Sequence, residues 1–124
     1  MRNKEEDSLQ IACMAYLKVQ YPDVVAFHVR NEGISGSRAK QQAFGVKSKR
    51  MGVLSGVSDI VILEPRGIYH GAMIELKSKK GRLRESQKDF LDNCEDRKYQ
   101  IRVFNNFDDF QAFIDWYMTL EKNY

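Results

Sequence analysis

The chain has 124 residues, 43% of them apolar and 30% charged, with a net charge of +3; this is typical of one globular domain, here residues 1–124. Two cysteines are too few for a disulfide scaffold or a four-thiolate zinc site, and no apolar run approaches the ~20 residues of a membrane span. Because the charged N-terminus lacks the apolar region of a signal peptide, we expect a cytoplasmic protein with reduced thiols.

The first half of the chain predicts a helix, a strand and a basic segment. Apolar residues recur at helical spacing over residues 5–20, and Pro22 ends this helix. Residues 24–29 are rich in β-branched and aromatic side chains, which predicts a strand. Residues 31–56 have weak periodicity, and we expect a loop with at most one short helix there.

The second half predicts two strands, a helix, a strand and a last helix. Strands at 59–63 and 68–77 flank a turn at 64–67 and form a hairpin. A helix at 84–95, a strand at 99–104 and an amphipathic helix capped by Asn106 follow. Because the central strands are apolar on both faces, we predict an α/β sandwich of order α-β-β-β-α-β-α, with helices covering both faces of the sheet.

Charged residues interrupt the two central strands. Asp59 opens the first strand, and Glu75 and Lys77 lie on one face of the second because side chains alternate along a strand. A hairpin would bring Asp59 close to Glu75, and two carboxylates beside a lysine are a plausible Mg²⁺ site. The alternative is a turn cap and a solvated strand end, which is the better interpretation for each residue alone and the poorer one for all three together.

Polar residues also continue the buried stripes of two helices. Glu6 and Gln10 share a face with Cys13, and Gln87 shares one with Leu91. Exposed helix ends would tolerate such residues, but both helices must pack on the sheet that carries the acidic pair. We therefore expect Glu6, Gln10 and Gln87 to converge on the same site.

The sequence resembles the PD-(D/E)xK nuclease superfamily and, within it, the VRR-NUC branch of virus-type replication-repair nucleases. The resemblance covers nearly the whole chain. It is carried by Glu6 with Gln10, Asn31, Gly56-Val57-Ser58-Asp59, Tyr69-His70-Gly71, Glu75-Leu76-Lys77, Gly81-Arg82-Leu83 and Ser86-Gln87. The family often has proline where this chain has Ser58, a position that shapes the strand entry and is not a ligand. The resemblance implies a restriction-endonuclease-like sandwich with a mixed central sheet.

The resemblance also implies a metal site for Mg²⁺ or Mn²⁺. Asp59 and Glu75 would hold the metal together with the backbone carbonyl of Leu76. Glu6 would complete the site directly or through water. Glu5 is the rival of Glu6, because it shares a helix face with other inward residues.

For the reaction, the resemblance implies phosphodiester hydrolysis that leaves a 5′-phosphate. Lys77 would position the attacking water, and Gln87 would support the lysine or the water. Stand-alone members are typically homodimers and resemble Holliday-junction resolvases. The alternatives are a general nuclease for flaps, nicks or duplex, and a catalytically weak DNA-binding module.

The basic residues of the chain are candidates for DNA binding, because an acidic site that accepts a polyanion needs cations around it. We expect these basic residues to contact DNA phosphates independently of base sequence. The alternative is that they form a solvated run of charges with no partner. The set comprises Arg38, Lys40, Lys47, Lys49, Arg50 and Lys79. The aromatic last helix is interpreted as core or as a dimer surface, and neither His28 nor His70 stands at metal-site spacing.

Overall fold

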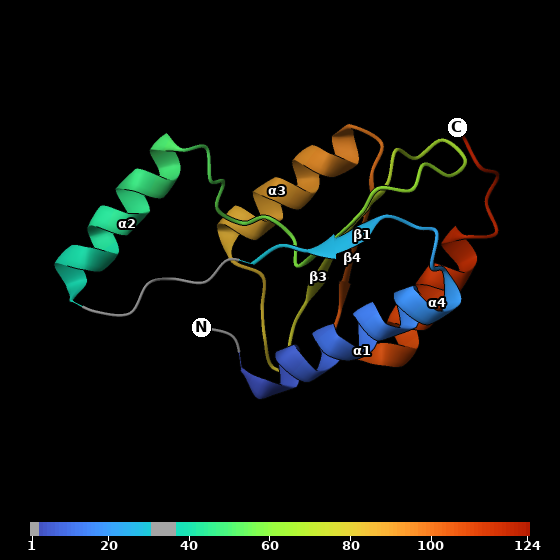
Figure 1. Ribbon diagram of the computed structural model, residues 1–124, viewed down its shortest axis with the longest axis horizontal. Helices are drawn as coiled ribbons and strands as arrows, with labels where there is room; N and C mark the ends of the chain where they lie inside the picture. The colour runs from blue at the N-terminus through green and yellow to red at the C-terminus, as the bar shows by residue number, and fades with distance from the viewer. Residues whose placement is uncertain (1–2, 31–36) are drawn as a thin grey trace.

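The computed structural model describes residues 3–30 and 37–124, so Asn31 lies outside the described residues. The predicted order is confirmed, with one helix inside the basic segment (Figure 1). In chain order the elements are α1 (Lys4–Gln20), β1 (Ala26–His28), α2 (Arg38–Arg50), β2 (Ile60–Ile62), β3 (Ala72–Leu76), α3 (Glu85–Asp96), β4 (Gln100–Phe104) and α4 (Phe107–Tyr117).

The four strands form one mixed sheet in the order β1-β2-β3-β4. The β1–β2 and β2–β3 pairs are antiparallel, which confirms the predicted hairpin, and the β3–β4 pair is parallel. Within the hairpin Ile60 lies opposite Ile74. Because β3 and β4 run in the same direction, their carboxyl ends meet at one edge of the sheet.

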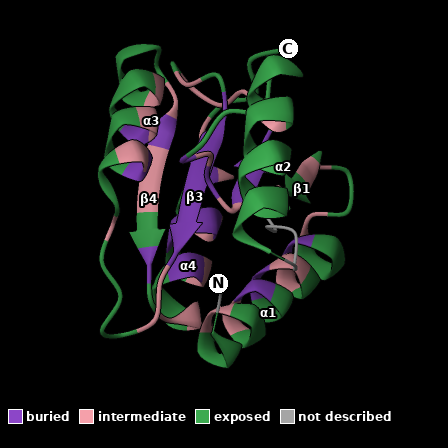
Figure 2. Ribbon diagram, turned by 90° about the vertical axis from the view of Figure 1, so that its left-hand side faces the viewer, coloured by how far each residue is buried: buried purple, intermediate pink, exposed green. Residues whose placement is uncertain are grey.

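Helices cover both faces of the sheet, as the apolar strands predict (Figures 1 and 2). On one face, Cys13 and Leu17 of α1 pack with Ile60 and Ile74, together with the apolar residues of α4. On the other face, Leu91 of α3 packs against the smaller cluster that β2 and β3 present there. The site residues on β3 must therefore face one of these two helical layers.

The last helix belongs mainly to the protein's own core. Asn106 caps α4 through its side chain, as predicted, and accepts a hydrogen bond from the backbone of Asp109. Phe110 and Tyr117 are fully buried, whereas Trp116 is 43% exposed. Of the two interpretations of this helix, core packing therefore accounts for most of its aromatic residues.

The helix in the basic segment has a different character. Ser37 caps α2 by accepting a hydrogen bond from the backbone of Lys40, yet none of its residues is buried. Figure 1 shows α2 standing apart from the sheet and from the other helices. Isolated helices of this length are marginal in water. Across the described part of the chain, no helix is both long and apolar enough to cross a membrane.

Candidate active site

The site begins with the position of Asp59 at the head of β2. Continuing the register by one residue beyond Ile60 and Ile74 places Asp59 opposite Glu75. The Oδ2 atom of Asp59 accepts a hydrogen bond from the backbone N–H of Leu76 at 2.7 Å. Its backbone oxygen accepts from the Val29 amide at 2.9 Å, so both ends of this residue are held. The predicted approach of Asp59 to the end of β3 is confirmed.

A close backbone contact fixes the segment that leads into Asp59. Gly56 has φ +84°, and a Cβ atom built on it would lie 2.2 Å from the backbone oxygen of Ser86 on α3. Only glycine permits this approach and this backbone conformation without strain. The tight contact therefore sets the start of β2 against the first turn of α3, which carries Gln87.

Glu75 is the buried carboxylate of the site, with 3% of its surface exposed. Gln87 donates a hydrogen bond from Nε2 to Oε1 of Glu75 at 2.9 Å, and Lys77 Nζ lies 3.7 Å from the same oxygen. A buried carboxylate needs such partners, because desolvation otherwise disfavours its charge. The inward position of Gln87 is confirmed, but its amide contacts Glu75 and not Lys77.

Two hydrogen bonds from backbone N–H groups fix the positions of Gln87 and Lys77. Gln87 also accepts a hydrogen bond from the backbone N–H of Arg84 at 2.9 Å, which closes the N-terminus of α3 and fixes the amide. The backbone N–H of Lys77 donates to the oxygen of Phe104 at 2.9 Å, so β3 stays paired with β4 up to the lysine. Glu75 and Lys77 share a face by strand alternation, and this is the face covered by α3.

The N-terminal helix reaches the same end of the sheet by another route. Glu5 accepts a hydrogen bond from the backbone N–H of Lys79 at 3.3 Å, whereas Glu6 is half-buried. Gln10 is buried as predicted, and its amide atoms have no hydrogen-bond partner among the described residues. The apolar residues of α1 pack on the face of the sheet opposite α3, so any approach of its first turn to the site is at the end of the sheet, where Glu5 contacts Lys79.

Oxygen ligands define the kind of metal that this site could hold. The carboxylates of Asp59 and Glu75 and the carbonyl of Leu76 gather at one strand end, and hard oxygen ligands of this kind suit Mg²⁺ or Mn²⁺. Such ions keep several waters, so two carboxylates suffice. Within residues 3–30 and 37–124, no three His, Cys, Asp or Glu side chains form a metal-binding group, and the role of Glu6 stays a prediction.

Some features near the site could not be read from the sequence. His28 on β1 makes a 2.7 Å hydrogen bond through Nδ1 with the backbone oxygen of Asp59. Ser58, where the family often has proline, is fully buried, and its hydroxyl has no hydrogen-bond partner within the described part of the chain. The pairing of β1 with β2 places His28 beside the head of β2. In the sequence, Gly56 is the one residue of its motif that points to a close contact with α3.

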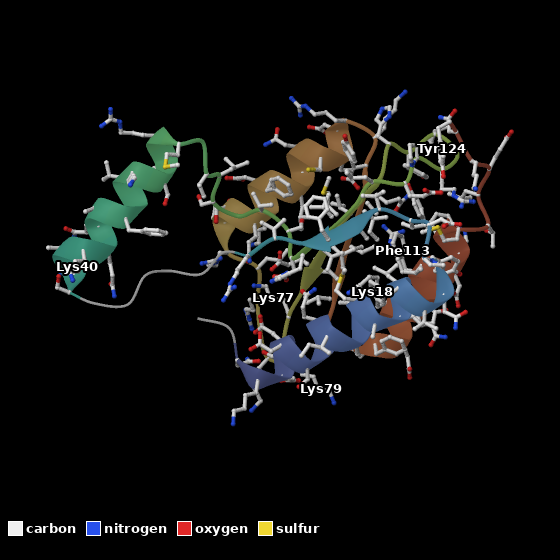
Figure 3. All side chains as sticks on the ribbon, viewed as in Figure 1. Lys18, Lys40, Lys77, Lys79, Phe113 and Tyr124 are labelled. Atoms are coloured by element: carbon white, nitrogen blue, oxygen red, sulfur yellow. The ribbon has the colours of Figure 1, made fainter. Side chains whose placement is uncertain are left out.

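Five of the six expected DNA-binding residues lie on α2, and the sixth, Lys79, follows β3. Figure 3 shows Lys77 near the middle of the molecule, Lys79 below it, and Lys40 well apart from both at the far end of α2. The cations of α2 are all exposed, and no acidic residue occurs in that helix. The side chains of α2 are therefore available to phosphates that approach from solvent.

A mixed sheet between helical layers, with an aspartate at the head of one strand and Glu-x-Lys at the end of the next, defines a restriction-endonuclease-like nuclease fold. The sequence model of the VRR-NUC domain matches residues 4–107, and the chain belongs to this family of nucleases. A solved structure described as a VRR_NUC domain protein superposes with a TM-score of 0.75 at 24% identity, covering 98% of this chain and 94% of that one. No curated protein matches the sequence.

Proposed function

We propose that this protein is a metal-dependent DNA endonuclease that hydrolyses phosphodiester bonds. The observation that carries the proposal is the hydrogen bond from the Leu76 amide to Asp59 at the strand end that bears Glu75 and Lys77. The alternative, a solvated strand end, does not fit this arrangement, because Glu75 is buried. Its neighbours Gln87 and Lys77 are both held in position by backbone hydrogen bonds. Membership of a nuclease family supports the same conclusion.

Each side chain has a role that its position supports. Asp59, Glu75 and the Leu76 carbonyl would hold Mg²⁺ or Mn²⁺, which when bound lowers the pKa of a water and offsets charge on the phosphate. Lys77 is half-buried beside Glu75, so it is placed to orient the attacking water and to stabilise developing negative charge. Gln87 holds Glu75 by its hydrogen bond and so acts through that carboxylate as a positioning residue.

DNA is the substrate that the charge distribution favours. The helix α2 is free of acidic residues and presents its five cations to solvent, and Lys79 is exposed next to the site. Phosphate contacts from such side chains give binding that is salt-dependent and independent of base sequence. The cations would therefore bring the DNA backbone to the acidic centre.

The finer proposal is selectivity for branched DNA by a homodimer. One chain carries one such site, and two symmetric cuts in a four-way junction require two sites related by a two-fold axis. Trp116 is the aromatic residue of α4 that stays substantially exposed, and it is available to such an interface. Sedimentation equilibrium at micromolar concentration tests this part, and a monomer that cuts flaps or linear duplex would favour a general nuclease.

A cleavage panel tests the proposal as a whole. Four-way junction, flap and linear duplex DNA are each incubated with the protein in Mg²⁺, in Mn²⁺ and in EDTA. We expect cleavage in both metals, none in EDTA, and the fastest cleavage on a branched substrate. DNA binding without cleavage under all conditions would support the catalytically weak DNA-binding module instead.

A further inference from the structure

A hollow of about 350 Å³ adjoins the candidate active site at the carboxyl ends of β3 and β4. Lys77 forms part of its wall, together with the loop that follows β3 and the first turn of α4. Its volume lies within the range of ligand pockets, ~300–1,000 Å³. The parallel pairing of β3 and β4 creates the hollow, because it brings residues that follow both strands to one edge of the sheet.

The walls of the hollow combine apolar and polar groups. Val103, 43% exposed, and the half-buried Leu83 supply apolar surface, while Ser78, Asn105 and Asp109 supply polar groups. Most of the lining is polar, and these two apolar side chains suit the face of a ring whose edge carries hydrogen-bonding groups. A heterocycle with a polar edge can use both kinds of surface.

The negative charge of Asp109 favours a nucleobase over a phosphate as the ligand of the hollow. Its Oδ2 accepts a hydrogen bond from Asn106 Nδ2 at 2.9 Å, while its backbone N–H donates to Asn106 Oδ1 at 2.9 Å, so the carboxylate is held in place. A fixed carboxylate repels a phosphate and accepts hydrogen bonds from the N–H groups of a base edge. Asn105, whose Oδ1 also accepts from Asn106, adds an amide on the same rim.

We propose that this hollow binds one unpaired nucleobase of the DNA strand, next to the phosphodiester bond that is cut. The inference rests on the proposed function, since it is Lys77 that connects the hollow to the reacting phosphate. A base stacked in duplex cannot enter a side pocket, so the nucleotide must be unstacked first. Substrates whose nucleotide at the cut is already unpaired, at a flap or a branch point, avoid this cost.

Two neighbouring aspartates provide a matched test. Asp109→Asn keeps the size of the side chain and its oxygen for Asn106, but replaces one acceptor oxygen by a donor. Asp108→Asn makes the same change of charge one residue away, on an exposed side chain that does not line the hollow. Each variant and the wild type are assayed for kcat/KM on a flap substrate and on the same flap with an abasic site at the nucleotide beside the cut.

We expect Asp109→Asn to lower kcat/KM about 10-fold or more on the intact flap, the scale of a lost charge-assisted hydrogen bond. Asp108→Asn should stay within about twofold of wild type. On the abasic flap the wild type should fall to the level of Asp109→Asn, and the substitution should have no further effect. Two results would contradict the nucleobase pocket without contradicting the nuclease proposal. One is an equal loss of kcat/KM in both variants, and the other is a wild-type kcat/KM that an abasic site does not change at any position flanking the cut.

Fluorescence of 2-aminopurine separates this result from a failure of the proposed function. Placed beside the cut, the unstacked base should change its emission on binding to wild type and less so on binding to Asp109→Asn. A wild-type protein that neither binds nor cuts DNA in Mg²⁺ or Mn²⁺ would overturn the nuclease proposal and the pocket together. A protein that cuts with unchanged emission at every position beside the cut would overturn only the pocket.

Discussion

The carboxylate of Asp59 accepts a hydrogen bond from the backbone N–H of Leu76, the residue between Glu75 and Lys77. This contact joins the head of β2 to the end of β3, so the acidic residue and the Glu-x-Lys segment are held as one unit. The bond uses a backbone donor, and it therefore persists when neighbouring side chains are replaced. Substitutions of Glu75 or Lys77 should therefore change the reaction without disrupting the fold.

Metal binding should depend on the two carboxylates. We predict that isothermal titration calorimetry detects Mn²⁺ binding to the wild type and no binding to Asp59→Asn or Glu75→Gln, because each change removes an anionic ligand. Asp92→Asn, on the exposed face of α3, is the matched control and should bind as wild type does. Ca²⁺ should bind and inhibit, since it suits the geometry poorly. Unchanged binding in both site variants would refute the ligand assignment.

Lys77 should affect the reaction more than binding. Lys77→Ala should lower the cleavage rate by ~10²-fold or more, the scale of a lost acid–base or electrostatic group. Metal and DNA affinities should be retained, because the Nζ atom is paired with Glu75 and is not a ligand. Lys88→Ala removes an exposed lysine of α3 as a control and should cleave normally. A Lys77 variant that cleaves near the wild-type rate would make the lysine only structural.

The helix α2 should contribute salt-dependent DNA affinity without contributing stability. Changing Lys47, Lys49 and Arg50 together to Ala should leave Tm unchanged, since none of them is buried. It should weaken DNA binding and reduce the slope of log affinity against log salt by about 0.9 for each phosphate that the variant no longer neutralises.

Removal of Lys18 and Lys122, outside the basic segment and the site, should leave this slope unchanged. If the triple variant also keeps its slope, α2 is a solvated helix and the DNA path lies elsewhere.

A carboxylate far from the site, Asp115, should contribute to acid stability. Asp115 on α4 accepts hydrogen bonds from Tyr16 at 2.6 Å and from Tyr21 at 2.7 Å, and these bonds, that of Tyr16 first, lower the pKa of Asp115 below its ordinary 3.8. The folded state then binds fewer protons than the unfolded state between the two pKa values. The contribution of Asp115 is therefore complete above pH 3.8 and is lost as the pH falls through the lowered pKa.

Thermal unfolding followed from about pH 6 to about pH 2.5 measures this effect. Asp115→Asn should reduce Tm at neutral pH by about 3–6 °C, the equivalent of about 1 kcal/mol in a domain of this size, and should flatten its acid dependence. Asp92→Asn should do neither. Parallel curves for Asp115→Asn and wild type would show that the tyrosine contacts add nothing to stability.

Local patterns predict the parts of the site that lie on one hairpin. Asp59, Glu75 and Lys77 can be placed together because side chains alternate along a strand and because consecutive strands pair in antiparallel fashion. The partner of Gln87 cannot be predicted in this way, because the helix that carries it is set against the head of β2 by the close approach of Gly56 to Ser86. That approach joins segments far apart along the chain.

Other features depend on tertiary structure. The hollow beside Lys77 requires the parallel pairing of β3 with β4, which no local pattern specifies. The apolar stripes of α1 and α3 predict that both helices pack on the sheet, but not that they cover opposite faces of it. The sequence predicts a loop with at most one short helix in the basic segment, and the 13-residue α2 fills half of it without burying any side chain.

The most direct test of the central claim is the cleavage rate of Asp59→Asn relative to wild type in Mg²⁺, on the branched substrate that the wild type cuts fastest. The variant keeps an oxygen that can accept from the Leu76 amide, so it should fold with an unchanged Tm and bind DNA normally. The account predicts that its cleavage falls to the level of wild type in EDTA. Cleavage by a folded Asp59→Asn protein at a rate close to wild type would contradict it.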